Sequence, residues 1–336
     1  MNGHRIQEPE RLGRTVLPGG RALGWAEWGP EDGVPVLLCP GAATSRRLGL
    51  GVRTPGRDGG RADDPVAGLG VRLICLDRPG LGVSDPTPEG TLSGFAEDVR
   101  HLVAERGLHD PAVIGFSQGA PFALACAWAG VVRAAAVVSG SDELAHPGLA
   151  GKLAPDVRAM VEAVAADPSG AEADVADRAG PDVLCDLVVR LSGETDRRFC
   201  TAPGFARPFR RAVREGFAQG PGGYAHEVVL TMSRWPFDPA QITVPVDLWY
   251  GARDTSPVHS PDLGASLARR IGTARRHVVS DAGGALLWTH ARAVLTALLE
   301  RHGHALAGGR ASGPRAPRAR GHSRTGNSTD RGSVGP

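Results

Sequence analysis

Residues 112–126, AVIGFSQGAPFALAC, restrict the fold more than any other stretch of the sequence. A short run of β-forming residues leads into Ser117, and an alanine- and leucine-rich helical run follows it. Ser117 stands between Gly115 and Gly119, in the Gly-x-Ser-x-Gly pattern of a sharp turn that lifts a serine hydroxyl above a sheet edge. Side chains at the two glycine positions would collide with the strand and the helix. The stretch therefore predicts a nucleophilic serine at a helix N-terminus, whose dipole would favour a nearby oxyanion.

The rest of the chain alternates between β-type and helical segments. Apolar runs typical of buried parallel strands, such as VPVLLC at 34–39, recur along the sequence and are separated by helix-like segments. Such alternation is typical of an α/β fold with a mainly parallel sheet, helices on both faces and functional residues where strands end. The expected strands, eight in all, are 14–17, 21–28, 34–39, 71–76, 112–116, 134–139, 244–250 and 276–280, and the expected helices are 91–106, 120–129, 261–271 and 291–301.

The alternation stops in one long interval. Between residues 145 and 235 the sequence is helix-like, mixed in charge and interrupted by prolines and glycines, which indicates an inserted helical cap. The last residues are rich in Gly, Arg, Ser and Pro, a composition that cannot bury a core. The expected organisation is a flexible tail at 1–12, an α/β core formed by 13–144 and 236–305, a cap at 145–235, and a disordered basic tail at 306–336.

Composition excludes several functional classes. The formal net charge is only +2, which gives no sign of nucleic-acid binding, and the five cysteines lack CxxC spacing. The charged N-terminus has no apolar segment of a signal peptide, and no uninterrupted apolar run reaches membrane-spanning length. We predict a cytoplasmic protein with no nucleic-acid or membrane partner; the sequence leaves its oligomeric state open.

Three further motifs follow predicted strands. They are PGAATSR at 40–46, DRPGLGVSD at 77–85 and GARDTSP at 251–257. With GFSQG at 115–119, their order and spacing resemble the α/β-hydrolase superfamily over residues 12–302, in its serine-nucleophile, capped subgroup. The resemblance implies an α/β-hydrolase fold and an esterase-like serine hydrolase. Such an enzyme would cleave a small ester, thioester, lactone or amide through an acyl-serine, with no metal or cofactor.

The same resemblance implies roles for individual residues. Ser117 would be the nucleophile, and Asp254, which follows a buried strand, would be the acid that orients a histidine. The backbone amides of Ala42 and Gln118 would form the oxyanion hole. The residues expected to contact substrate are Gly41 and Phe116.

The general base has no residue at its customary place. The family places a histidine after the last strand, where this chain has Gly284. His290 lies six residues further on, and the glycines before it could let the loop bring it in. His259, five residues after Asp254, is the second candidate. The other histidines considered are His277, expected to be structural, and His146 and His226, which could reach the site from the cap.

The acid and the substrate pocket also have alternatives. Asp142, which follows the preceding strand, is a second position for a sheet-edge acid, whereas Asp77 and Asp85 are expected to brace their loop. Large apolar side chains of the cap could line a pocket or form the cap's own core. They are Met160, Phe199, Phe205, Phe209, Phe217, Tyr224, Met232 and Trp235.

Two other functions remain open at the sequence level. Because Gly284 stands where a histidine is expected, the chain could be a catalytically silent hydrolase fold that binds a small ligand or a partner protein. The same scaffold could also support cofactor-free oxidative or lyase chemistry. A serine hydrolase is the prediction favoured by the elbow, the loop at 40–46 and Asp254.

Overall fold

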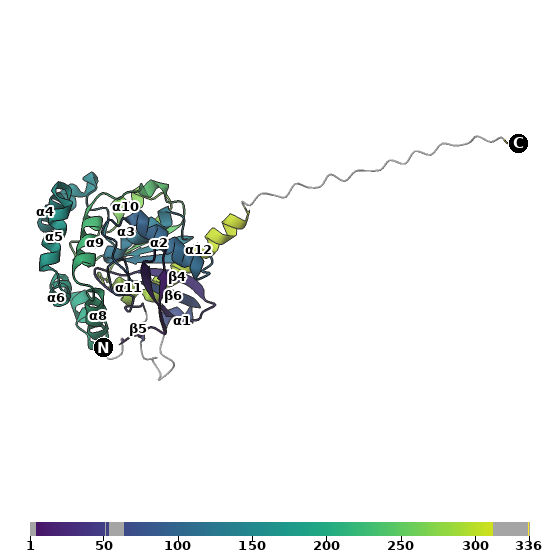
Figure 1. The fold of residues 1–336 in the computed structure, drawn as a ribbon, viewed down its shortest axis with the longest axis horizontal. Coiled ribbons are helices and arrows are strands. Elements are labelled where there is room, and N and C mark those ends of the chain that lie inside the picture. Colours follow the sequence, from purple (N-terminus) through teal and green to yellow (C-terminus); the bar gives the residue numbers. More distant parts are fainter. Residues whose placement is uncertain (1–4, 51, 54–63, 312–334, 336) are drawn as a thin grey trace.

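The computed structural model describes residues 5–50, 52–53, 64–311 and 335, and its centre is an eight-stranded sheet (Figure 1). The strand order is β10-β9-β8-β7-β4-β6-β3-β2. Six adjacent strands are parallel, namely β6, β4, β7, β8, β9 and β10, while β3 pairs antiparallel with both β2 and β6. The strands are β2 (Arg11–Val16), β3 (Ala22–Trp28), β4 (Val34–Cys39), β6 (Val71–Leu76), β7 (Ala112–Phe116), β8 (Ala134–Val138), β9 (Val246–Gly251) and β10 (Ala274–Val279).

Helices cover both faces of this sheet because its central strands are apolar on both sides. One core layer packs Leu37, Val113 and Val137 against one set of helices, and the other packs Val36, Ile114 and Ala136 against a second set. The first set is α2 (Leu92–Glu105), α3 (Ala120–Trp128) and α10 (Ala265–Arg270); the second is α1 (Pro65–Gly68), α11 (Leu286–Thr289) and α12 (Ala291–Ala311). The α/β-hydrolase fold expected from the sequence is confirmed.

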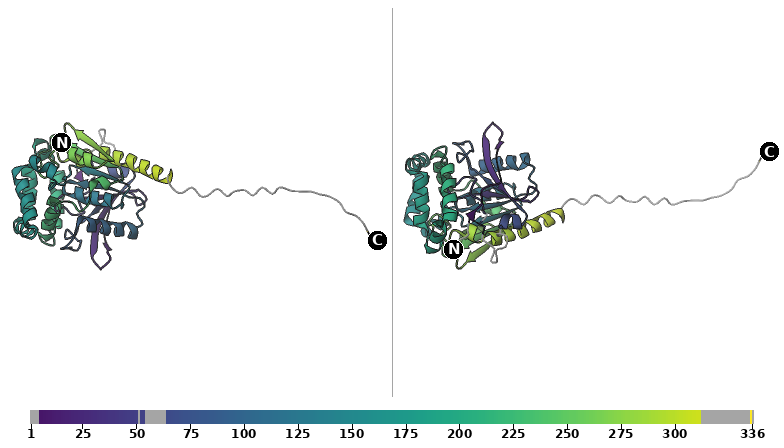
Figure 2. Two further views of the ribbon diagram at one scale, coloured as in Figure 1. Left: turned by 90° about the horizontal axis from the view of Figure 1, so that it is seen from above. Right: turned by 90° about the horizontal axis from the view of Figure 1, so that it is seen from below.

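Six α-helices separate β8 from β9, and we call them the inserted helices. Four of them begin with a proline, whose fixed φ and missing N–H suit the first helical turn. They lie together beyond one edge of the α/β core, opposite the end of α12 (Figures 1 and 2). They are α4 (Pro155–Ala166), α5 (Pro168–Arg178), α6 (Pro181–Leu191), α7 (Glu194–Cys200), α8 (Pro203–Gly216) and α9 (Gly222–Met232).

The inserted helices are attached unevenly to the core. The segment around α8 is bound through backbone hydrogen bonds from Ser45 to Ala212 (3.1 Å) and from Gly82 to Gly216 (3.4 Å). By contrast, α4, α5 and α6 pack chiefly on one another and on α8 and α9. They form an outer layer over the site, and the cavity described below lies under it. No described helix has the length and apolar character needed to cross a membrane.

Both ends of the chain differ from expectation. Within the expected N-terminal tail, β1 (Arg5–Ile6) pairs antiparallel with β5 (Val52–Arg53), and β2 begins at Arg11. These pairings join segments distant in sequence, so local composition does not predict them. At the other end, α12 continues to Ala311, beyond the expected boundary at 305. The remainder of the expected basic tail, 312–334 and 336, and residues 1–4 lie outside the described residues.

Candidate active site

Ser117 occupies a strained turn between β7 and α3. Its φ of +49° lies in the left-handed region, which a non-glycine residue rarely adopts. A Cβ added to Gly119 would lie 2.1 Å from the carbonyl oxygen of Cys39, and one added to Gly115 would lie 2.7 Å from Cβ of Ala123. Both glycines are therefore required by close packing. The turn presents the Ser117 hydroxyl at the C-terminal edge of the sheet, beside the first turn of α3.

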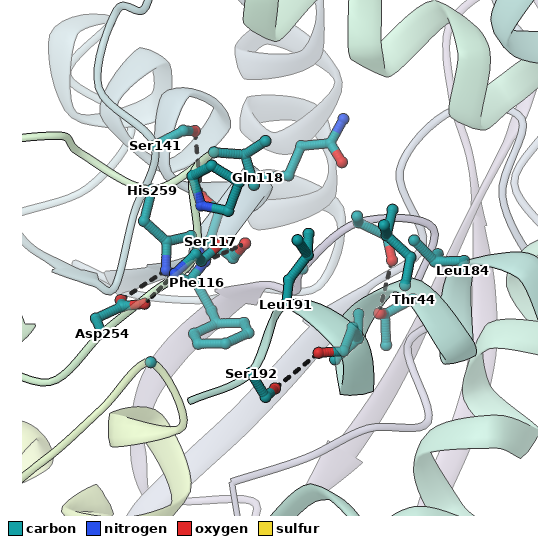
Figure 3. A pocket seen from close by; sticks show the side chains of 18 of the residues that line it. Thr44, Phe116, Ser117, Gln118, Ser141, Leu184, Leu191, Ser192, Asp254 and His259 are labelled. Atoms are coloured by element: carbon teal, nitrogen blue, oxygen red, sulfur yellow. Dashed lines mark hydrogen bonds and ion pairs between the residues drawn. The ribbon is translucent and has the colours of Figure 1, made fainter. Parts of the chain in front are cut away.

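A chain of two hydrogen bonds runs from this hydroxyl through His259 to Asp254 (Figure 3). His259 Nδ1 lies 2.7 Å from Asp254 Oδ2, and His259 Nε2 lies 2.9 Å from Ser117 Oγ. Because a carboxylate only accepts, Nδ1 donates to Asp254, which leaves Nε2 free to accept the Ser117 proton. The arrangement can remove a proton from the hydroxyl and hold it on the ring.

Both the acid and the ring come from the loop that follows β9. Asp254 is fixed by its own amide, which donates to Gly251 O (3.1 Å), and by the Ser256 amide, which donates to its Oδ1 (3.0 Å). The Ser260 amide donates to Gly140 O (2.9 Å) after β8, and this bond holds the loop against the neighbouring strand. A turn of five residues is thus long enough to place His259 between Asp254 and Ser117.

The structure separates the two histidines proposed from the sequence. His259 is buried beside Ser117, whereas His290 lies at the end of α11, where its Nδ1 shares a hydrogen bond with Thr289 Oγ1 (2.9 Å). His290 does not line the cavity that contains Ser117. Gly284 does line it, and a Cβ there would lie 2.9 Å from Asp254 Oδ1. Asp254 therefore lies beside position 284, where a histidine was expected, but it bonds to the ring of His259, which belongs to the loop after β9.

The remaining histidines and acids have other partners. His277 bonds to Asp247 (3.0 Å) and stacks on Trp249, in agreement with a structural role. The two histidines that could have reached the site from the cap also have other partners: His146 accepts from Gly148 N, and His226 bonds to Glu172 and Gly90 O. Asp77 accepts from the amides of Arg46 and Val83, and Asp85 accepts from the amide of Ala22, so both brace loops as expected.

The electrostatics of the two acidic positions differ. Burial would raise the pKa of Asp254, but attraction to His259, with hydrogen bonds from His259 and the Ser256 amide, outweighs burial and lowers it. Asp254 is thus held ionised, as an acid that orients a ring must be. Asp142 is also buried, and there desolvation dominates and raises the pKa to about 6. Asp142 contacts Ser260 at 3.4 Å rather than the His259 ring.

The loop after β4 closes the other side of Ser117. A Cβ on Gly41 would lie 3.2 Å from the Phe116 ring and 3.7 Å from Cβ of Ser117, so this backbone passes directly against the elbow. Gly41, Ala42, Phe116 and Gln118 all line the cavity that contains Ser117. The four residues expected to form the oxyanion hole or to contact substrate are therefore brought to the same place.

A cavity of about 570 Å³ lies between Ser117 and the inserted helices (Figure 3). One wall is aromatic: the Phe116 ring lies 4.7 Å from that of Trp288, which lies 4.8 Å from that of Phe205. A second part of the wall is aliphatic and comes from α4, α9 and the segment after β8. Its residues are Leu144, Val157, Met160, Val228 and Met232. Helix α6 adds Leu184, Leu187 and Leu191.

Few charges face this space. Arg190 is the one arginine or lysine among the described lining residues, and it is exposed to solvent, as is Asp156. Asp196 of α7 also lines the cavity, but its carboxylate accepts from the amides of Gly284 (2.7 Å) and Ala285 (3.0 Å). The cavity thus suits a neutral, apolar molecule whose polar atoms lie near Ser117.

The large apolar side chains expected in the cap divide into two groups. Met160, Phe205, Phe209, Tyr224 and Met232 line the cavity. Phe199, Phe217 and Trp235 pack into hydrophobic clusters instead. The sequence analysis did not predict a role for Trp288, which comes from the core and forms the centre of the aromatic wall. Its position, four residues after the expected histidine at 284, could have indicated that it lies near the site.

Comparisons with known proteins agree with this architecture. A profile of the alpha/beta hydrolase fold family matches residues 34–291. An esterase from a Rhodococcus species aligns at 20% identity and a TM-score of 0.58, covering 86% of this chain and 98% of its own. A thermophilic esterase from Thermogutta terrifontis aligns at 20% identity and 0.58, covering 87% and 99%. A bromoperoxidase from Bacillus anthracis aligns at 17% identity and 0.59, covering 86% and 100%. No curated protein matches the sequence.

Proposed function

The chain belongs to the alpha/beta hydrolase fold family, and we propose that it is a serine hydrolase acting on small, uncharged carboxylic esters. The observation that carries the proposal is the hydrogen-bonded series Ser117–His259–Asp254, with bonds of 2.9 and 2.7 Å. This geometry supports an active enzyme despite the glycine at position 284, which was the feature that favoured a catalytically silent protein. Thioesters, lactones and amides would react by the same chemistry.

Acylation begins when Ser117 Oγ attacks the ester carbonyl while His259 Nε2 takes the hydroxyl proton. The carbonyl oxygen becomes an oxyanion, which the amides of Ala42 and Gln118 stabilise. When the tetrahedral intermediate collapses, the bond to the alkoxy group breaks and His259 returns its proton to the departing oxygen. The products are an alcohol and an acyl group on Ser117. Asp254 stabilises the charged ring throughout.

Deacylation repeats these steps with water as the nucleophile. His259 takes a proton from the water, its oxygen attacks the acyl carbonyl, and the same two amides stabilise the second oxyanion. Collapse breaks the bond to Ser117 Oγ, which regains its proton from His259. The carboxylic acid leaves, and every proton borrowed by the ring is returned.

The cavity supports the choice of substrate. Its aromatic and aliphatic walls favour apolar groups, and the arginine that lines it is at the solvent-exposed rim, so a buried carboxylate or phosphate would lack a partner. We therefore propose esters whose acyl or alcohol group is an aliphatic or aromatic hydrocarbon of modest size.

A fluorophosphonate probe tests the nucleophile directly. We expect the probe to label Ser117 in the wild-type protein and not in Ser117→Ala, and we expect turnover of short p-nitrophenyl esters to disappear with the labelling. Ser192→Ala is the matched control, because Ser192 lines the same cavity but its hydroxyl donates to Val188 O (2.7 Å). Folded wild-type protein that is neither labelled nor active would leave a ligand-binding role and reject the hydrolase.

A further inference from the structure

Arg78 is a fully buried arginine beside the loop that closes the Ser117 site. It belongs to the motif at 77–85, whose aspartates brace loops but whose arginine has no place in the mechanism above. Its Nη1 donates to Pro40 O, and its Nη2 donates to Gly41 O at 2.9 Å. The guanidinium therefore holds two successive carbonyl groups of the loop after β4. A third contact places it over the Phe122 ring in α3, 5.1 Å from the centroid.

The Gly41 carbonyl has a direct relation to the proposed oxyanion hole. It shares one peptide unit with the Ala42 amide, and in a planar trans peptide the C=O and the N–H point in opposite directions. Fixing the oxygen of this unit therefore fixes the direction of the N–H. Donation from a charged guanidinium also polarises the peptide, which strengthens the hydrogen bond that its N–H can donate.

The other side of the guanidinium is held by an inserted helix. Glu227 of α9 accepts from Arg78 Nε and, at 2.8 Å, from Arg78 Nη2, and both side chains are buried. Burial alone would lower the pKa of Arg78, but attraction to Glu227 outweighs burial and raises it, so the arginine stays charged. The loop at 40–42, α3 and α9 are thereby joined through one ion pair.

We propose that the buried Arg78–Glu227 pair is a positioning device for the oxyanion hole, which aims and polarises the Ala42 amide and makes this depend on the seating of α9. Arg78 acts through the Gly41–Ala42 peptide and does not touch the substrate. The proposal rests on the proposed function for its effect on rate, whereas its effect on the peptide is a property of the folded chain. Its signature is a loss of transition-state stabilisation with little change in ground-state binding.

The test compares wild type with Arg78→Met/Glu227→Met, which removes both charges and leaves no buried ion unpaired. Because losing an oxyanion donor costs about 100- to 1000-fold in kcat, we expect misaiming one of two to lower kcat by about 10- to 100-fold, with KM changed less than about threefold. Affinity for a trifluoromethyl ketone, whose adduct with Ser117 carries the oxyanion, should fall in parallel. Arg47→Met is the control, because Arg47 also joins the core to an inserted helix, through Glu215 of α8 (2.6 Å), and its described ion pairs are with Glu215 and Glu8.

A second readout does not require activity. Labelling glycine with ¹³C at the carbonyl and alanine with ¹⁵N selects Gly-Ala peptides, including that of Ala42. We expect the Ala42 amide resonance to move and its heteronuclear NOE to fall in the double variant, and both to stay in Arg47→Met. An unchanged Ala42 amide, or an equal loss of kcat in the control, would overturn the proposal. An inactive wild type rejects the hydrolase, while the Ala42 resonance still decides whether the pair holds the peptide.

If the double variant does not fold, the single variant Glu227→Gln tests the same proposal. It keeps the shape of the side chain and a hydrogen bond to Arg78 but removes the charge. We expect a smaller change of the same kind, in both the Ala42 resonance and kcat. A Gln variant with wild-type values for both would likewise overturn the proposal.

Discussion

Replacing His259 with alanine tests the central feature of the proposed mechanism. The variant removes the group that lies 2.9 Å from Ser117 Oγ and 2.7 Å from Asp254, so the hydroxyl loses its proton acceptor and the acid loses its partner. Loss of the histidine from such a series costs about 10⁴- to 10⁶-fold in kcat in related chemistry, or about 5 to 8 kcal/mol of transition-state stabilisation. We expect a loss in that range, with residual activity from the amides that face the oxyanion.

The same substitution has a consequence for Asp254. Attraction to His259 and a hydrogen bond from it are two of the causes that hold the pKa of Asp254 low, while burial acts in the opposite direction. Without the ring we expect that pKa to rise. In the wild type, the lowered pKa contributes stability that is present above the unfolded value and is lost as the pH falls through the folded value. The stability of His259→Ala should therefore fall less on acidification than that of the wild type.

The assay is kcat and kcat/KM for p-nitrophenyl butyrate, with circular dichroism to confirm folding and urea unfolding at pH 3 to 7 for stability. His290→Ala is the matched control, because its ring bonds to Thr289 and does not line the cavity. We expect this control to keep its activity within about twofold, since surface substitutions away from special features rarely matter. A folded His259→Ala variant that kept a tenth of wild-type kcat would refute the assignment of the base. So would a His290→Ala variant whose kcat fell by the factor expected for His259→Ala.

Three further predictions concern residues around the Ser117–His259–Asp254 series. Gly119→Ala should destabilise the protein in urea by about 3 kcal/mol or more and abolish activity, because the new Cβ would lie 2.4 Å from the backbone oxygen of Pro40. Asp142→Asn should remove a decline in stability as pH rises from 4 to 7. Its pKa is raised from 3.8 to about 6 by burial, which destabilises the ionised form by about 3 kcal/mol, measurable as unfolding free energy against pH. Met160→Trp should lower kcat/KM for esters with long acyl or alkyl chains by about tenfold and spare acetates. Met160 lines the cavity from α4, one of the inserted helices, and a larger side chain there would fill space that a long chain needs.

Much of the fold followed from local sequence. The strands β4, β6, β7, β8, β9 and β10 were each predicted to within about two residues. The first five are mostly apolar runs bounded by turn residues and are largely buried, whereas β10, at the edge of the sheet, is partly exposed. The elbow followed for a similar reason: a serine at positive φ, packed on both sides, requires glycines at 115 and 119. The pairing of β1 with β5 was not foreseen, since it joins residues 5–6 with 52–53 and depends on tertiary contacts.

The sequence limited the general base to a few candidate histidines but could not decide between them. Ser117 and Asp254 were identified because Ser117 directly follows β7 and Asp254 lies three residues after the end of β9, and the sheet fixes where strands end. The path of the loop after β9 is instead set by contacts with other segments, such as the bond from the Ser260 amide to Gly140 O. Sequence spacing placed His259 near Asp254, but only these contacts turn its ring toward Ser117.

The glycines at 283 and 284 have a physical explanation once this loop supplies the base. A Cβ on Gly283 would lie 2.3 Å from the Asp196 carboxylate, which enters from α7 and accepts from the amides of Gly284 and Ala285. A Cβ on Gly284 would press against Asp254. The loop after β10 is therefore packed between two acids, Asp254 of the proposed catalytic series and Asp196 of α7. With acid and base both on the loop after β9, the loop after β10 is available as a docking point for α7. A histidine at 284 would require the Asp254 carboxylate to shift, because its Cβ would lie 2.9 Å from Asp254 Oδ1, whereas glycine leaves that carboxylate free to bond to His259.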